Sequence, residues 1–414
     1  MRILHVTHQY RPALGGSEQH VINISEELAR RGHRVDVFTT RSRDYRTWRN
    51  ELRGRERLDG VEVRRFRSIE RRAYTWRLLD YGYINYRRRR EPIYQPFILF
   101  GSGPISPGLF LNVLLRAGRY DVIHVNTLPY AHLWYIYLAA SARRVPLVVT
   151  PFIHVKQPEI FDVECFNAAL RGADVVMAMT SVERDYMVAR GVDPARTRIG
   201  GVGIKPAELT PEPRGVWRAH FSIPQEAFAV LFLGRRTEYK GLDTLLEAYA
   251  RLRAMDSKAT LLLAGPASSY WEGLRAKYQG LSGILDFGQV SDMDKARLLD
   301  ACDLLVLPST GESFGIVFVE AWTLGKPVVG ACSGAIADMI TEGEDGLLVA
   351  PGDAEDLACK LGVLMDNPEL RQYLGENGYQ KAMAKYTVEK VSDDVEKVYT
   401  ELASRRNREG EAQA

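Results

Sequence analysis

The chain has 414 residues, of which 46% are hydrophobic and 26% charged, and its formal net charge is +3 at pH 7. This ordinary globular composition excludes collagen-like, disordered and disulfide-stapled proteins, and at ~100 to 200 residues per domain it predicts two or three domains. The balanced charge gives no overall sign of a polyanionic partner. Scattered cysteines without metal-ligand spacing indicate a reducing compartment, and we expect all four as small core residues: Cys165, Cys302, Cys332 and Cys359.

Membrane-spanning segments are not expected, because no window of the sequence reaches the ~18 to 20 apolar residues that a spanning helix requires. Residues 1–7 are too short for the apolar core of a signal peptide and are typical of a strand. We therefore expect a cytoplasmic protein that is soluble, or peripheral on the cytoplasmic leaflet of the membrane.

The first half of the chain alternates strands and helices. It opens with a strand at Ile3–Thr7, a loop rich in proline and glycine, a helix at Ser17–Arg30 and a strand at Val35–Thr39. This βαβ pattern predicts a parallel sheet covered on both faces, as in Rossmann-like domains. Further apolar runs predict strands at Val122–Val125, Leu147–Phe152 and Val175–Met179.

A second alternating series follows a proline-rich stretch, Lys205–Arg214, which we interpret as a linker. Amphipathic helices are predicted at Asp243–Met255 and Asp292–Ala301. Two doubly wound domains in tandem predict a ligand cleft at the carboxyl ends of both sheets. The strands predicted in this half are Val230–Leu233, Thr260–Ala264, Ile284–Phe287, Leu304–Leu307, Val328–Gly330 and Leu347–Val349.

The segment Arg41–Arg90 has an unusual charge, since it holds 17 arginines and no lysine against seven acids. With its aromatic residues and the apolar run Phe97–Phe100, it predicts an amphipathic basic surface, which anionic lipid headgroups attract by ~1 kcal/mol per basic residue. A solvated arginine-rich insertion explains the composition equally well. Nucleic-acid binding is not expected, because no recognition motif accompanies the charge. The aromatic residues are Tyr45, Trp48, Tyr74, Trp76, Tyr81, Tyr83 and Tyr86.

The loop between the first strand and the first helix contains Gly15 and Gly16. Such a pair lets backbone N–H groups approach a ligand, and the start of a helix favours negative charge, so the loop is a candidate phosphate site. It lacks both the G-x-G-x-x-G spacing of a dinucleotide site and the lysine of a P-loop, which weakens NAD and ATP as ligands. A plain turn is the alternative.

Two cations, Arg235 and Lys240, leave the end of the first strand of the second half. At the ligand edge of a parallel sheet they could neutralise a diphosphate, and an arginine fork could hold it through two hydrogen bonds. The alternative is a surface loop with two solvated cations.

Glu312 and Glu320 form an E-x7-E pattern after the strand Leu304–Leu307. Glu320 lies in an apolar helical run, where a carboxylate is costly unless it has partners such as sugar hydroxyls. We expect Gly315 to open this helix and to free backbone N–H groups, and Glu312 to stay on the preceding loop. A coincidence of two acids is the alternative.

Two further patterns are weaker. His154 follows a predicted strand at its carboxyl end and could contact a sugar, although a lone histidine is usually structural. Asp292 and Asp294 match the D-x-D pattern of metal sites, but acids at a helix start, capped by Ser291, explain them more simply. We therefore predict no metal ligands.

These blocks together resemble the retaining GT-B glycosyltransferases, specifically the large family-four group of nucleotide-sugar enzymes. The resemblance covers nearly the whole chain, and the E-x7-E block is its specific part. The matching blocks are P-x-x-G-G-S-E with the run Arg31–Phe38, then G-R-x-x-x-x-K-G, E-S-F-G-I-V-F-V-E-A, and D-G-L-L-V-A-P-G-D at Asp345–Asp353.

The resemblance implies a retaining hexosyltransferase that moves a sugar from a nucleotide-diphosphate sugar to an acceptor hydroxyl in glycolipid, polysaccharide or other glycoconjugate synthesis, without a cofactor or metal. It implies an acceptor-side domain at 1–205, onto which 388–414 crosses back, and a donor domain at 206–387. It also implies that Gly15 and Gly16 approach the donor, and that Arg235 and Lys240 bind its diphosphate. His154 and Glu312 would contact the transferred sugar. Glu320 would bind the ribose, and backbone amides would come from Gly315, Ile316 and Val317.

One departure from the family pattern concerns the sugar pocket. Where many members have Gly-Gly-Glu after the E-x7-E helix, this chain has Ser333-Gly334-Ala335 and later Asp338. A sugar-nucleotide 2-epimerase, a phosphorylase and a non-catalytic sugar-nucleotide-binding protein would use the same fold, but no motif favours them. From the charge of Arg41–Arg90 we expect a lipid-linked or membrane-presented acceptor.

Overall fold

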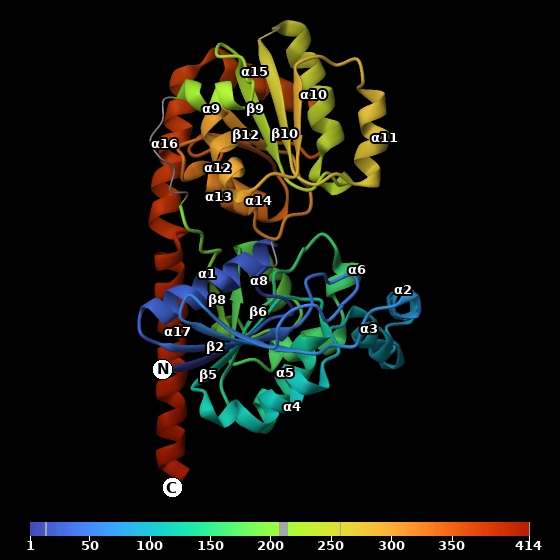
Figure 1. Ribbon diagram of the computed structural model, residues 1–414, viewed down its shortest axis with the longest axis vertical. Coiled ribbons are helices and arrows are strands. Elements are labelled where there is room, and N and C mark those ends of the chain that lie inside the picture. Colours follow the sequence, from blue (N-terminus) through green and yellow to red (C-terminus); the bar gives the residue numbers. More distant parts are fainter. Residues whose placement is uncertain (13–14, 207–213, 257, 414) are drawn as a thin grey trace. The chain divides into compact units, whose positions relative to one another are not determined.

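A computed structural model describes residues 1–12, 15–206, 214–256 and 258–413. The chain forms two compact units, which we name unit 1 (residues 1–203 and 388–414) and unit 2 (residues 204–387). Each unit is built on one β-sheet with helices on both faces (Figure 1). The α/β fold with two Rossmann-like sheets that we predicted is therefore confirmed.

The sheet of unit 1 has eight strands in the order β3-β4-β2-β1-β5-β6-β7-β8. Neighbouring strands run parallel, except that β3 and β4 are antiparallel. The carboxyl ends of the parallel strands therefore share one edge, where loops to the following helices begin. The strands are β1 (Arg2–Val6), β2 (Arg34–Thr40), β3 (Arg55–Leu58), β4 (Val61–Phe66), β5 (Val122–Asn126), β6 (Leu147–Thr150), β7 (Val175–Ala178) and β8 (Thr197–Ile199).

The core of unit 1 has two layers because alternate residues of each strand point to opposite faces. In β1, Ile3 joins one apolar cluster, whereas Leu4 and Val6 join the other. The helices of unit 1 are α1 (Gly16–Arg30), α2 (Ala73–Arg89), η1 (Pro92–Tyr94), α3 (Gln95–Ser102), α4 (Pro107–Arg116), η2 (Ala117–Arg119), α5 (Ala131–Ala142), α6 (Pro158–Phe161), α7 (Glu164–Arg171), α8 (Ser181–Val188), η3 (Pro194–Arg196) and α17 (Val388–Gln413).

The segment Arg41–Arg90 is only partly an insertion. Its middle forms the β3–β4 hairpin, and β4 pairs in parallel with β2, so the hairpin belongs to the main sheet. Two of its aromatic residues, Trp48 and Tyr86, are buried in unit 1. The interpretation of the whole segment as one solvated insertion is therefore wrong, and only its last third projects as α2.

Helix α17 brings the end of the chain back onto unit 1. Its valines and leucine at helical spacing pack on the face of the sheet that α1 also covers. Figure 1 shows α17 running along the side of this sheet next to α1. The apolar residues that α17 contributes to this cluster are Val388, Val391, Val395, Val398, Tyr399 and Leu402.

Tyr399 also closes a buried chain of hydrogen bonds beneath α17. The Ser25 hydroxyl donates to the Val21 carbonyl oxygen, so it accepts from Nδ1 of His5 (2.7 Å). Nε2 of His5 then accepts from the Tyr399 hydroxyl (2.9 Å), whose oxygen accepts from Nδ1 of His124 (2.5 Å). Nε2 of His124 accepts from the Thr150 hydroxyl (2.7 Å). With both imidazoles neutral, every side-chain donor and acceptor named in this hydrogen-bonded network has a partner.

Unit 2 has a six-stranded sheet in the order β11-β10-β9-β12-β13-β14, and all of its strands run parallel. Its helices are α9 (Arg214–His220), η4 (Glu238–Lys240), α10 (Leu242–Met255), α11 (Ser269–Lys277), α12 (Asp292–Ala301), α13 (Ile316–Trp322), α14 (Gly334–Met339), α15 (Ala354–Asp366) and α16 (Pro368–Lys385). Its strands are β9 (Phe228–Leu233), β10 (Ala259–Ala264), β11 (Ile284–Gly288), β12 (Leu304–Leu307), β13 (Val328–Ala331) and β14 (Leu347–Val349).

The cysteines follow the sequence expectation only in part. Cys165 and Cys302 are buried as expected, but Cys332 and Cys359 are exposed, so only two of the four cysteines are core residues.

Within the described residues, no single helix is long and apolar enough to cross a membrane. The pair Pro92–Ser102 and Pro107–Arg119, bent by 100°, meets the same length and composition criteria together.

The buried histidines of unit 1 predict a pH-dependent stability. Burial lowers the pKa of His5 and His132 to about 3, that of His20 to about 4, and that of His124 well below its usual range. These side chains stay neutral in the folded state, whereas in the unfolded state they bind protons below pH ~6.5. The free energy of unfolding is therefore fully retained above pH ~6.5 and falls as the pH drops, by up to ~1.4 kcal/mol per pH unit for each histidine.

Urea unfolding at a series of pH values between 5 and 8, followed by circular dichroism, measures this slope. Tyr399→Phe should lower the free energy of unfolding by about 1–3 kcal/mol at every pH, because it leaves two imidazole nitrogens unpaired. A stability that does not change between pH 7 and pH 5 would contradict the neutral histidine chain.

Candidate active site

The loops after β9 and β12 meet at the carboxyl edge of the unit 2 sheet because these two strands are neighbours. The first loop carries Lys240 and the second carries Glu312. Nζ of Lys240 lies 2.5 Å from Oε1 of Glu312, and the two side chains are only 13% and 11% exposed. The structure therefore brings two of the predicted site residues into a nearly buried ion pair.

Backbone geometry fixes the contact between these loops. Gly241 has φ +69°, and a Cβ there would lie 2.2 Å from the carbonyl oxygen of Pro308, so only glycine fits. The Tyr239 carbonyl oxygen accepts hydrogen bonds from the Ser309 hydroxyl (3.0 Å) and from the backbone N–H of Thr310 (2.9 Å). Lys240 thus brings its ammonium to this edge of the sheet, and Gly241 lets the second loop approach the first.

The two adjacent arginines of the first loop have different surroundings. Arg235 is exposed, and its Nη2 lies 3.5 Å from the Tyr239 hydroxyl. Arg236 is 1% exposed, donates two hydrogen bonds to the Asp286 carboxylate (2.7 and 2.5 Å) and stacks on the Trp271 ring. Burial acts to raise the pKa of Asp286, but the guanidinium outweighs burial and holds this pKa below its ordinary value. Arg235 therefore remains accessible to a ligand, while Arg236 ties β9 to β11.

Glu320 has a protein partner that the sequence did not indicate. Its Oε1 lies 2.5 Å from Nζ of Lys295 on α12, and its side chain is 21% exposed. Burial raises the pKa of Glu320, and the ammonium of Lys295 only partly offsets this effect. As expected, Gly315 precedes α13, with φ +96°. The backbone N–H groups of Ile316 and Val317 form the first turn of this short helix.

The D-x-D residues act as helix-start acids. The Ser291 hydroxyl accepts a hydrogen bond from the backbone N–H of Asp294 and so caps α12. Asp294 pairs with Arg297 (3.0 Å), and Asp292 lies 3.4 Å from Lys295. In the part of the chain that the structure describes, no group of three or more histidine, cysteine or acidic side chains is placed to hold a metal ion.

At the carboxyl edge of the unit 1 sheet, Gly15 and Gly16 begin α1. A Cβ on Gly15 would lie 1.9 Å from the Glu18 carboxylate, which folds back over this glycine. Nε2 of His8, in the loop after β1, lies 2.8 Å from the same carboxylate, and both side chains are buried. The helix start therefore already holds a carboxylate, and the predicted phosphate contact of the glycine pair remains a prediction.

His154 lies on the loop after β6 and is half-buried, with its ring 5.7 Å from that of Phe161. The buried Glu183, on α8, accepts hydrogen bonds from the backbone N–H groups of Ile153 (2.6 Å) and Met179 (2.5 Å). Burial raises the pKa of Glu183 to about 7. This carboxylate fixes the backbone next to His154, so it positions the loop that carries the predicted sugar contact.

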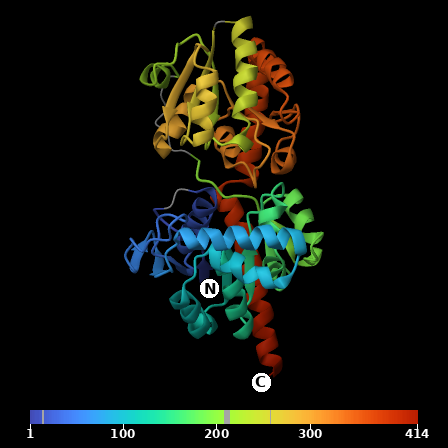
Figure 2. The same ribbon diagram turned by 90° about the vertical axis from the view of Figure 1, so that its right-hand side faces the viewer.

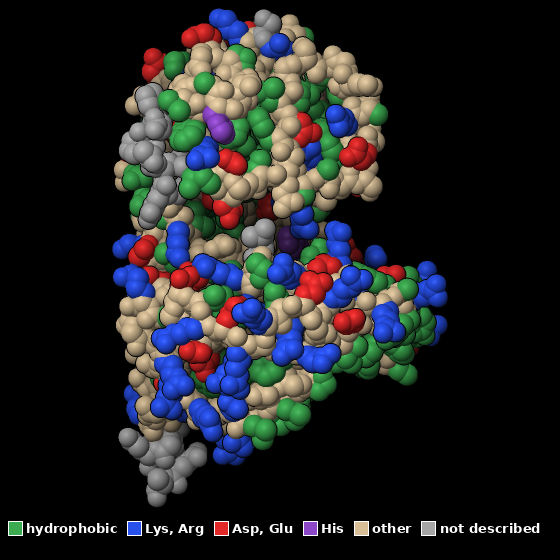
Figure 3. Space-filling view, in the orientation of Figure 1, with side chains coloured by type: hydrophobic (Ala, Val, Ile, Leu, Met, Phe, Trp, Pro, Cys, Tyr) green, Lys and Arg blue, Asp and Glu red, His purple; other side chains and the backbone are tan. Residues whose placement is uncertain are grey.

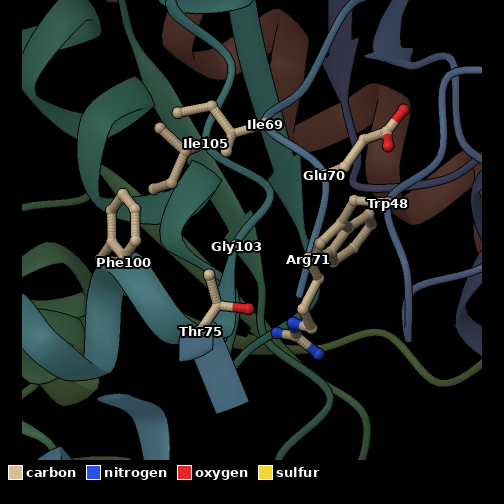
Figure 4. A pocket seen from close by; sticks show the side chains of 8 residues that line it. All are labelled: Trp48, Ile69, Glu70, Arg71, Thr75, Phe100, Gly103 and Ile105. Atoms are coloured by element: carbon tan, nitrogen blue, oxygen red, sulfur yellow. The ribbon is translucent and has the colours of Figure 1, made fainter. Parts of the chain in front are cut away.

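Two hollows lie away from these residues. A space of about 260 Å³ in unit 2 opens near the amino ends of β9 and β10, beside Arg253 and Lys258. The other, in unit 1, has room for about one water, at about 10 Å³ (Figure 4). Neither hollow contains a predicted site residue. The unit 1 hollow is lined by Trp48, Ile69, Glu70, Arg71, Thr75, Phe100, Gly103 and Ile105.

Sequence analysis missed Lys295, His8 and Glu183 as members of these clusters. No motif spacing signals them, because the contacts of Lys295 with Glu320, of His8 with Glu18 and of Glu183 with Ile153 arise only in the tertiary fold. The available signal is a titratable residue within about five positions after the carboxyl end of a strand, and both His8, after β1, and Glu183, after β7, satisfy it.

Comparison with protein families matches both units. Residues 15–203 match the glycosyl transferase 4-like domain, and residues 214–381 match glycosyl transferases group 1. The chain belongs to the family-four glycosyltransferases of GT-B fold. The resemblance inferred from the sequence is therefore confirmed, and the protein is a glycosyltransferase.

Individual proteins agree with this assignment. The chain is 28% identical over 408 residues to D-inositol 3-phosphate glycosyltransferase of Nocardioides sp., covering 89% of this chain and 81% of that protein. Its fold is similar to that of Anabaena Alr3699/HepE in complex with UDP and glucose (TM-score 0.72, 21% identity, 97% and 99% of the two chains). It is also similar to sucrose-phosphate synthase from Thermosynechococcus elongatus (TM-score 0.72, 22% identity, 98% and 100%).

The contrast between the two adjacent arginines of this glycosyltransferase gives a prediction. Arg236→Ala should lower the free energy of unfolding of unit 2 by about 1–3 kcal/mol, because it leaves the Asp286 carboxylate without its guanidinium. Arg235→Ala, at an exposed position, should change it by less than ~0.5 kcal/mol. Urea unfolding of the two variants measures both effects, and equal destabilisation would show that Arg235 is also structural.

Proposed function

We propose that the protein transfers a hexosyl group from a nucleoside diphosphate sugar to an acceptor hydroxyl with retention of anomeric configuration, in glycolipid, polysaccharide or other glycoconjugate synthesis. The observation that carries this proposal is the Lys240–Glu312 pair beside Arg235 at the ligand edge of the unit 2 sheet. A diphosphate needs cations and a sugar needs hydrogen-bond acceptors, and this edge offers both within one cluster.

A nucleotide-sugar donor is supported by the structural neighbours. Anabaena Alr3699/HepE has been crystallised with UDP and with UDP-glucose. We assign the diphosphate of the donor to Arg235 and Lys240, which supply two positive charges from one loop. Breaking the bond between the sugar and the phosphate oxygen builds negative charge on the leaving diphosphate, and these cations stabilise it as it forms.

The ion pair gives Glu312 two roles in this scheme. Without donor, its carboxylate offsets the cost of holding the Lys240 ammonium away from water. When a diphosphate binds, the ammonium gains a new anionic partner, and Glu312 turns to accept hydrogen bonds from the sugar hydroxyls. Donor binding then exchanges one ion pair for another, and no charge is left buried without a partner.

Glu320 is assigned to the ribose. Its carboxylate keeps one oxygen on Lys295, so the other oxygen can accept from the ribose hydroxyls. The first turn of α13 adds the N–H groups of Ile316 and Val317, and Gly315 leaves the approach to them open. Each new hydrogen bond offsets part of the cost of keeping this carboxylate away from water.

Retention requires the acceptor hydroxyl to attack the face of the sugar that the diphosphate leaves. We propose that an oxygen of the departing phosphate takes the proton of that hydroxyl, so that neither a protein nucleophile nor a metal is needed. His154, Gly15 and Gly16 are assigned to contacts with the transferred sugar and the donor. Glu183 supports His154 by holding the backbone of its loop.

Turnover of a panel of nucleotide sugars tests the function, with product configuration read by NMR. Arg235→Ala and Lys240→Ala should each lower donor turnover by ~100-fold or more, about 2.7 kcal/mol of barrier, because the leaving charge loses a cation. EDTA should leave the wild-type protein active. Loss of activity on chelation, with recovery on adding magnesium or manganese, would overturn the metal-independent site.

The division of roles between the two glutamates is tested by calorimetry with the free nucleoside diphosphate. Glu320→Ala should weaken binding by ~1 to 3 kcal/mol, because it removes an acceptor from the ribose hydroxyls. Glu312→Ala should not weaken it, since the Lys240 ammonium is then released to the diphosphate, but sugar transfer should fall. Equal losses of nucleotide affinity in both variants would contradict this division.

A further inference from the structure

Exposed apolar side chains gather on one part of unit 1. Among the described residues, seven of the 17 large hydrophobic side chains with high exposure lie within residues 69–100. This segment is less than a tenth of the chain, so the clustering is not an even scatter over the surface. Figure 3 shows hydrophobic side chains gathered in the region of α2 and α3, with Lys and Arg side chains around them. The seven are Ile69, Tyr74, Trp76, Tyr81, Ile84, Ile93 and Phe100.

One side of α2 presents apolar and basic residues together. Positions spaced by three and four residues along a helix share one face, and Figure 2 shows α2 lengthwise on the side of unit 1 nearest the viewer. All five residues at this spacing are exposed. A solvated helix face would be mainly polar, but this one combines two tyrosines and an isoleucine with two arginines. The face, which we name the α2 outer face, consists of Tyr74, Arg77, Tyr81, Ile84 and Arg88.

The arginines of this region divide into two groups. Arg71 donates to the carbonyl oxygens of Gly101 (2.6 Å) and Ser102 (2.5 Å), and Arg90 donates to that of Asp162 (2.9 Å). These guanidinium groups hold the fold together, as does Arg89 through the Tyr94 hydroxyl (2.9 Å). By contrast, the side chains of Arg77, Arg87 and Arg88 are exposed and make no hydrogen bond or ion pair with any other described residue.

The hairpin of α2 and α3 that carries this face is well packed. A Cβ on Gly82 would lie 2.9 Å from the side chain of Ile98, and one on Gly101 would lie 2.6 Å from that of Leu79, so the two helices approach closely through these glycines. Arg71 stacks on the ring of Trp76 (4.1 Å) at the start of α2. The α2 outer face therefore belongs to an ordered element, and its exposure is not the result of a loose fold.

We propose that the α2 outer face, extended by Arg87 and by Ile93 on η1, binds the surface of an anionic membrane. Unpaired guanidinium groups attract lipid phosphates, and tyrosine and isoleucine side chains suit the boundary between headgroups and acyl chains. A nucleic acid would use the arginines but would leave the isoleucines without a role. The two aliphatic side chains are 49% and 67% exposed, which favours the lipid.

Vesicle sedimentation measures this binding without any turnover, so its outcome is separate from that of the sugar-transfer proposal. The full chain should sediment with vesicles of phosphatidylglycerol and phosphatidylcholine, weakly with phosphatidylcholine alone, and less as salt rises. Changing Arg77, Arg87 and Arg88 to Gln should lower the affinity roughly 100-fold, since each basic residue contributes about fivefold. The double variant Ile84→Ser with Ile93→Ser should lose roughly tenfold, and this loss should persist at high salt.

Matched control variants distinguish the effect of where the substituted residues lie from the effect of the change in net charge and hydropathy. Lys277, Lys385 and Lys397 are exposed elsewhere, and changing all three to Gln removes the same charge. Met255→Ser with Val363→Ser removes two exposed apolar side chains of unit 2. Both controls should bind anionic vesicles like the wild-type chain, and thermal unfolding should show that every variant is folded.

Several results would overturn the proposal. They are equal sedimentation with neutral and anionic vesicles, equal losses in the arginine variant and its lysine control, and tighter binding to a short DNA duplex than to anionic vesicles. Self-association that the double isoleucine variant abolishes, without vesicle binding by the wild-type chain, would show instead that the face joins two copies of the protein.

Discussion

The adjacency of β9 and β12 is the constraint on which the candidate active site depends. These strands are about 70 residues apart in sequence but share hydrogen bonds in a parallel sheet, so their carboxyl ends release two loops at one place. The loops then touch backbone to backbone at Gly241. Without this pairing, the lysine of one loop and the glutamate of the other would be separate surface charges of little energetic consequence.

Opposite charges in close contact give the unit 2 edge its electrostatic character. Lys240 with Glu312, and Lys295 with Glu320, form two short ion pairs from four different elements. In each pair the cation and the carboxylate are little exposed, so each group reduces the cost of burying the other. Such an edge suits a ligand that carries both negative charge and hydroxyl groups. In each pair the lysine can bind the negative charge and the carboxylate can accept hydrogen bonds from the hydroxyl groups.

Most of the architecture followed from local patterns. Apolar runs of three to five residues located the strands of unit 2 to within two residues, because strands buried on both faces leave few polar positions. The β3–β4 hairpin escaped because its exposed positions carry arginine and glutamate, which hide the alternation. The E-x7-E spacing located Glu312 and Glu320, but not their lysine partners, since ion pairs between distant elements leave no mark on local sequence. In the same way, the local sequence did not distinguish the exposed Cys332 and Cys359 from the two buried cysteines.

The return of α17 to unit 1 has a consequence for how the protein is made. Residues up to 203 supply the whole sheet of unit 1, yet part of its core comes from Val388 to Leu402, near the end of the chain. On the ribosome, the face of this sheet that carries Ile3 and Val35 stays uncovered by α17 until about 200 further residues have been synthesised. Unit 2 is complete before that moment. A segment made after unit 2 therefore completes the core of the unit made before it.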